Sequence, residues 1–128
     1  MILTLGDRPA ELARAVASAQ ALAGGPAAGD EVQVVVVGNG ADVPPVPGGV
    51  TMLRLPSNVG VPAGRNAGVG ACTGDVILFL DDDGWYPDTG LAGHVAGRFA
   101  ADPALAVLSF RVTDPGGGFG GRWHVPRL

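Results

Sequence analysis

Short apolar runs alternate along the chain with longer segments whose apolar residues recur at helical spacing. The predicted strands are residues 2–5, 31–37, 50–55, 75–80 and 105–112. Helices are predicted between them, over the alanine-rich stretch after Pro9 and over residues 58–71 and 89–101. Such alternation is typical of a mostly parallel sheet with helices on both faces. We therefore expect an α/β fold with three α/β/α layers, of the Rossmann-like kind.

The predicted helix over residues 58–71 is unusual in its glycine content. It contains Gly60, Gly64, Gly68 and Gly70, with Asn58 near its start. A glycine inside a helix is less favourable than an alanine by about 1 kcal/mol, so helix propensity does not explain these residues. They suggest that the helix backbone approaches a sheet or a ligand closely.

The length of 128 residues is typical of one domain, and we place its folded part at residues 1–113. Residues 114–128 are glycine-rich and are predicted to form a flexible tail. No apolar run approaches the roughly 20 residues of a membrane-spanning helix, so we expect a soluble domain without a transmembrane segment. The N-terminus does not have the pattern of a signal peptide, and the single cysteine suits a reducing compartment, which favours a cytoplasmic location.

The charged residues exclude several classes of function. The net charge is -4, and the eight basic residues are all arginines, scattered along the chain. This pattern argues against nucleic acid as a partner. Because the chain has no lysine, it cannot form a P-loop, a Schiff base or a lysine general base.

Three consecutive carboxylates, Asp81, Asp82 and Asp83, follow the predicted strand over residues 75–80. Ligands of parallel sheets bind at the carboxyl ends of the strands, where this triplet lies. The carboxylates repel one another unless a cation or hydrogen-bond donors offset the repulsion, and a hard divalent ion does so well. A solvated turn into Gly84 is the structural alternative. The position at the sheet edge and the aromatic pair that follows, Trp85 and Tyr86, favour a metal or ligand site.

The order of the motifs resembles family 2 of the GT-A glycosyltransferases over almost the whole chain. Each motif is weak alone, but their order and spacing together are fairly specific. The matching segments are Thr4 with Asp7-Arg8, Val37-Gly38-Asn39-Gly40, Asn58-Val59-Gly60, Gly64-Arg65-Asn66-Ala67-Gly68 and the DxD segment Phe79-Leu80-Asp81-Asp82-Asp83.

This resemblance implies an inverting transferase domain that binds a nucleotide-diphospho-sugar linked to UDP, dTDP or GDP. Asp81 and Asp83 would bind Mg²⁺ or Mn²⁺, which stabilises the departing nucleoside diphosphate as a Lewis acid. Gly38 stands where many members have an aspartate that contacts the base. The donor-binding residues implied are Thr4, Asp7, Arg8, Gly38, Asn39, Asn58, Gly60, Arg65, Asn66, Asp81 and Asp82.

The family's acceptor-binding half, with its general base, would follow the DxD segment, and we expect the sheet to be truncated before it. The catalytic residues and the acceptor are therefore unknown, and neither His94 nor His124 is expected to be catalytic. An apolar edge left exposed after Val112 would favour self-association.

Three other functions are alternatives for this sequence. The first is a noncatalytic scaffold that binds a nucleotide or no ligand. The second is an aspartyl-phosphate phosphotransfer domain, which is disfavoured because its acidic cluster follows the first strand and works with a lysine, whereas here the first strand ends in Thr4-Leu5-Gly6-Asp7. A nucleotidyltransferase is disfavoured too, since the start of the chain lacks a glycine-rich phosphate loop with basic residues.

Overall fold

The protein is described by a computed structural model that covers residues 1–22, 32–114 and 116. Within these residues, a four-stranded parallel sheet with the strand order β3-β2-β1-β4 is combined with three helices. This arrangement confirms the predicted α/β fold. The elements are β1 (Ile2–Thr4), α1 (Pro9–Ala21), β2 (Val34–Asn39), β3 (Val50–Leu55), α2 (Gly60–Val69), β4 (Leu80–Asp81) and α3 (Leu91–Ala101).

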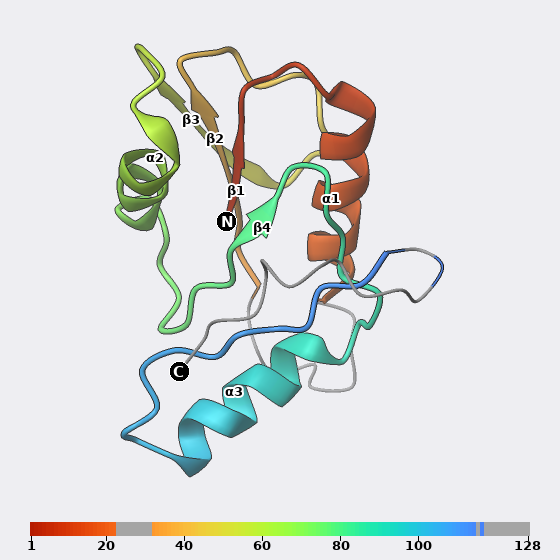
Figure 1. Ribbon diagram of the computed structural model, residues 1–128, viewed down its shortest axis with the longest axis vertical. Coiled ribbons are helices and arrows are strands. Elements are labelled where there is room, and N and C mark those ends of the chain that lie inside the picture. Colours follow the sequence, from red (N-terminus) through yellow and green to blue (C-terminus); the bar gives the residue numbers. More distant parts are fainter. Residues whose placement is uncertain (23–31, 115, 117–128) are drawn as a thin grey trace.

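Helices α1 and α2 cover opposite faces of the sheet (Figure 1). On the α1 side, the main core is formed by Ile2, Val34 and Val36 of the sheet with Leu12 and Val16 of the helix. β2 lies inside the sheet and is buried along its whole length, which suits its run of β-branched valines. α1 begins at Pro9, whose ring is preorganised for the first helical turn.

The glycines of α2 allow its backbone to approach the other face of the sheet. A Cβ atom added at Gly64 would lie 2.8 Å from Leu3 Cδ1, and one added at Gly68 would lie 2.8 Å from Val37 Cγ2. Both glycines are buried and are one helical turn apart. The close approach expected from the sequence is therefore to the sheet.

The prediction of a strand over residues 75–80 was largely wrong. β4 consists of Leu80 and Asp81, which pair with Ile2 and Leu3 of β1. Since β1 begins at Ile2, residues 75–79 lie beyond the end of the neighbouring strand. Before β4, this segment is hydrogen-bonded to the start of the chain through Met1, whose amine donates to the Leu78 carbonyl at 2.7 Å.

The prediction of a fifth strand over residues 105–112 was also wrong. These residues form no strand and are mostly exposed, with Val107 at 79%. A strand needs a partner backbone for its hydrogen bonds, and β4 offers only two residues at this edge of the sheet. The chain reaches this segment from α3, which lies near the end of the sheet where the strands begin (Figure 1).

The predicted tail over residues 114–128 and His124 lie almost entirely outside the described residues. No helix in residues 1–22 or 32–114 has the length and apolar character needed to cross a membrane.

Candidate functional site

The carboxyl ends of β1, β2 and β4 meet at one edge of the sheet. Thr4 is in register with Gly38 of β2, and Leu3 is in register with Asp81 of β4. The acidic triplet therefore lies beside the end of β1, as its position after an apolar run predicts. This is the edge at which ligands of parallel sheets bind.

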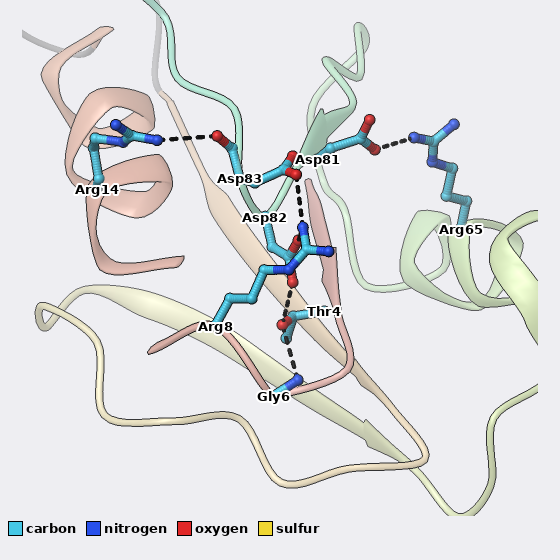
Figure 2. A network of polar contacts seen from close by, with 8 residues as sticks. All are labelled: Thr4, Gly6, Arg8, Arg14, Arg65, Asp81, Asp82 and Asp83. Atoms are coloured by element: carbon cyan, nitrogen blue, oxygen red, sulfur yellow. Dashed lines mark hydrogen bonds and ion pairs between the residues drawn. The ribbon is translucent and has the colours of Figure 1, made fainter. Parts of the chain in front are cut away.

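Asp82 is the most buried of the three carboxylates, with 15% of its side chain exposed. The hydroxyl of Thr4 donates to Asp82 Oδ2 at 2.7 Å and accepts from the backbone N–H of Gly6 at 3.0 Å (Figure 2). Thr4 itself is buried. The threonine thus connects the end of β1, the turn that follows it and the acidic segment.

Asp83 is held by Arg8, the residue directly before α1. Arg8 Nη1 lies 2.6 Å from Asp83 Oδ2 and 3.9 Å from Asp82 Oδ1. About half of each side chain of the Arg8–Asp83 pair is exposed. The guanidinium of Arg8 is therefore a cation shared unequally by two carboxylates.

Asp81 is held from the other side of the sheet by Arg65 of α2. Arg65 Nη2 lies 2.7 Å from Asp81 Oδ1, and the Asp81 side chain is 72% exposed. The guanidinium also lies over the ring of Phe79, with Cζ 5.4 Å from the ring centroid. An arginine directly before α1 and an arginine of α2 thus both reach the triplet, as Figure 2 shows.

These contacts bear on the predicted metal site at Asp81 and Asp83. Arg8, Arg65 and the Thr4 hydroxyl already offset the repulsion among the carboxylates, so the repulsion by itself does not require a metal ion. In the part of the chain that the structure describes, no three His, Cys, Asp or Glu side chains form a group able to hold a metal. The metal site remains a prediction.

A second polar cluster connects the end of β2 to the start of α2. The buried Asn39 donates through Nδ2 to Asn58 Oδ1 at 3.0 Å and accepts from the backbone N–H of Val59 at 3.0 Å. Asn58 Oδ1 also accepts from the N–H of Gly60 at 2.9 Å. Asn39 and Asn58 therefore position the first turn of α2, and these contacts use the side chains of both residues.

The other predicted donor-binding residues lie outside these two clusters. The turn after β2 leaves no room for a side chain at Gly38, because a Cβ atom there would collide with the carbonyl oxygen of Ala41. This close approach explains why the position carries no side chain. Asp7 and Asn66 are exposed.

Contacts from α1 to the residues after the triplet were not predicted from the sequence. Arg14 Nη2 donates to the Asp83 carbonyl at 3.1 Å, and Arg14 Cζ lies 4.1 Å from the centroid of the Trp85 ring. Ser18 Oγ accepts from the backbone N–H of Tyr86 at 3.1 Å. The only signal in the sequence is that Arg14 and Ser18 lie one helical turn apart.

The two aromatic residues after the triplet make contacts within the chain. Trp85 contacts Arg14, and Tyr86 packs against the main core. Burial raises the pKa of the Tyr86 hydroxyl to about 12. The sequence pattern favours a ligand site at both rings, whereas these contacts explain them without a ligand.

The chain has a parallel sheet between helices, and arginines pair with the carboxylates at its carboxyl edge. These features are those of a domain with part of the GT-A fold. The chain belongs to glycosyl transferase family 2, whose profile matches residues 2–127.

Two similar proteins are the pre-mycofactocin glycosyltransferases of Mycobacterium tuberculosis strains CDC 1551 / Oshkosh and ATCC 25618 / H37Rv. Each is 35% identical to this chain over 65 residues, which are 51% of this chain and 13% of the relative. The match therefore spans a small part of these proteins.

Proposed function

We propose that this chain binds the nucleoside diphosphate part of a nucleotide-sugar donor at the carboxyl edge of its sheet, for transfer of the sugar to an acceptor. The observation that supports this most is the meeting of Arg8, Arg65 and the acidic triplet at that edge in a member of glycosyl transferase family 2. Arginines and carboxylates together suit a diphosphate and a divalent cation.

The donor set at the triplet fits Mg²⁺ or Mn²⁺. Both ions prefer oxygen ligands, and at diphosphate sites Mg²⁺ takes one or two carboxylates and completes its shell with phosphate oxygens and water. Asp81 and Asp83 are the two carboxylates that are more than half exposed, whereas Asp82 is held by Thr4. The bound ion would supply Lewis-acid stabilisation of the charge on the leaving diphosphate.

Arg8 and Arg65 would bind phosphate oxygens of the donor. Their ion pairs with Asp83 and Asp81 are substantially exposed, and such pairs contribute roughly 0–1 kcal/mol each. A ligand can therefore replace them at small cost. A guanidinium released from a carboxylate can make the same forked hydrogen bonds to a phosphate.

Calorimetric titration with UDP, dTDP and GDP, with and without Mn²⁺, tests this proposal. We expect one nucleotide to bind more tightly when Mn²⁺ is present. Asp81→Ala and Asp83→Ala should remove this Mn²⁺-dependent gain, whereas Asp75→Ala, at an exposed carboxylate before β4, should keep it. The donor site would be refuted if none of the three nucleotides bound, or if both triplet variants kept the Mn²⁺-dependent gain of the wild type.

A noncatalytic scaffold is the second candidate function. It is favoured by the observation that each carboxylate of the triplet already has an arginine or hydroxyl partner within the chain. Hydrolysis of a UDP-, dTDP- or GDP-linked sugar by the purified chain would exclude the scaffold. Mn²⁺-dependent nucleotide binding without any turnover would favour it.

A further inference from the structure

The residues that follow β4 receive little support from the sheet. β4 ends at Asp81, and the turn after it has one backbone hydrogen bond, from Gly84 N to the Asp81 carbonyl at 3.0 Å. Asp83 lies in this turn, beyond the sheet ladder. Its position therefore depends on contacts with other elements.

Helix α1 supplies those contacts from two positions one turn apart. Arg14 donates to the Asp83 carbonyl at 3.1 Å and lies over the Trp85 ring at 4.1 Å, so it holds both ends of the segment 83–85. Ser18 accepts from the Tyr86 N–H at 3.1 Å while its hydroxyl donates to the Ala15 carbonyl at 2.8 Å. Figure 2 shows Arg14 reaching Asp83 from α1.

The helix that carries these side chains is rigidly placed. Leu12 and Val16, on either side of Arg14 in the sequence, are fully buried in the main core. Side chains on a packed helix hold a site more accurately than side chains on a loop. Arg14 therefore fixes the turn after β4 relative to the core, in which its helix is packed.

Arg8 and Arg14 hold different atoms of Asp83. Arg8 pairs with the carboxylate, which a cation or a diphosphate complex would take over. Arg14 pairs with the backbone carbonyl, which no ligand of the carboxylate needs. Only the Arg14 contact can therefore persist when the carboxylate changes partner.

We infer that Arg14 is a positioning residue of the donor site, which acts by holding the Asp83 carbonyl and the Trp85 ring so that the Asp83 carboxylate stays aimed at the bound cation. This inference rests on the proposed function. Ser18 supports the same segment one residue further along. Neither residue contacts the ligand in this account.

The test measures the affinity for UDP, dTDP and GDP, with and without Mn²⁺, for the wild type, Arg14→Ala and Arg14→Lys. We expect Arg14→Ala to reduce the Mn²⁺-dependent gain in affinity by about fivefold to tenfold, from the loss of one hydrogen bond and one cation–π contact. The affinity for the nucleotide without metal should stay within about twofold, because Asp83 contributes nothing favourable to an anion alone. Arg14→Lys keeps a donor and a charge, so it should recover part of the gain.

Arg98→Ala removes an exposed arginine of α3 and is the matched control, which should leave both affinities unchanged. In a Trp123→Phe background Trp85 is the only tryptophan, and its emission should change in Arg14→Ala because the guanidinium leaves the ring. Thermal unfolding identifies a variant that does not fold, in which case Arg14→Lys decides alone.

The outcomes separate this inference from the proposed function. An unchanged Mn²⁺-dependent gain in Arg14→Ala, or an equal loss with and without metal, would overturn the positioning role while the donor site stands. A wild type without any Mn²⁺-dependent gain for UDP, dTDP or GDP would overturn the metal-assisted donor site, and the positioning role with it.

Discussion

The Thr4 hydroxyl connects three parts of the candidate site. It donates to Asp82 and accepts from Gly6, and both bonds lie at the buried end of β1. Asp82 is therefore the member of the triplet whose side chain is bound by a residue of the sheet. Its role in this account is to fix the segment from which Asp81 and Asp83 extend.

Replacing Thr4 by valine, which has nearly the same shape, should lower the free energy of unfolding by about 1–3 kcal/mol. The reason is that a charged acceptor and a backbone N–H would both lose their partner. Urea denaturation measures the loss. Thr51→Val, at an exposed threonine on β3 whose hydroxyl accepts a long bond of 3.4 Å from Gln33, is the control and should change little. Equal effects in the two variants would refute the special role of Thr4.

Tyr86 predicts a pH dependence of stability. Because burial raises the pKa of its hydroxyl to about 12, the folded protein holds this proton more tightly than the unfolded chain, in which the pKa is about 10. The stabilisation is fully present below about pH 10 and is lost as the pH rises through about 12. We expect a loss of about 1–2 kcal/mol over this range, with allowance for partial exposure.

The chain suits this measurement because it has one tyrosine and no lysine. Denaturation at about pH 9 and about pH 12 should show the loss in the wild type but a smaller one in Tyr86→Phe. Tyrosinate absorbance gives the pKa directly. Ionisation of the folded protein near pH 10 would contradict the burial of the hydroxyl.

The strand pattern and the family resemblance together predicted part of the candidate site. The acidic triplet, Thr4, Arg8 and Arg65 do meet, because parallel strands bring their carboxyl ends to one edge. The arginine partners of the carboxylates were not predicted, and neither was Arg14, since the Arg14–Asp83 contact joins positions 69 residues apart. Contacts of that kind depend on where helices pack, which local patterns do not specify.

At the scale of elements, α2 is shaped by its contact with the sheet. Gly68→Ala should destabilise the protein by about 1–2 kcal/mol, because overpacking against the stiff Val37 side chain outweighs the gain of about 1 kcal/mol in helix propensity. Gly64→Ala should cost less, since the Leu3 side chain that it meets is flexible.

Gly70→Ala is the matched control for these two variants. A Cβ there makes an ordinary contact of 3.6 Å, and the backbone is right-handed helical, so the change should be neutral or stabilising. Thermal or urea unfolding of the three variants measures the order of their stabilities. Equal stability of Gly68→Ala and Gly70→Ala would contradict the close packing of α2.

The predicted strands differ in outcome for a physical reason. The predicted strand over residues 31–37 forms over residues 34–39, and the one over residues 50–55 forms as predicted, because each has a full-length neighbour. Residues 75–79 and 105–112 have similar composition but no partner of sufficient length among the described residues. Apolar, β-branched sequence therefore predicts a strand only where the sheet offers an edge to extend, which depends on the whole molecule.

For the whole molecule, exposure of apolar residues after α3 predicts self-association. Val107 is 79% exposed and Val112 is 51% exposed. Sedimentation at increasing concentration should show association in the wild type and less of it in Val107→Ser/Val112→Ser. Val61→Ser/Val69→Ser, at exposed valines of α2, is the control. A monomer at high concentration would contradict this prediction.

The carboxyl edge of the sheet is the proposed binding site of a nucleotide with a divalent cation. Paramagnetic broadening of backbone amide NMR signals by Mn²⁺ in the presence of UDP, dTDP or GDP tests the location directly. We expect the strongest broadening at residues 81–84 and 4–8, and we expect it to disappear in Asp81→Ala/Asp83→Ala. Broadening centred elsewhere, or unchanged in the double variant, would contradict it.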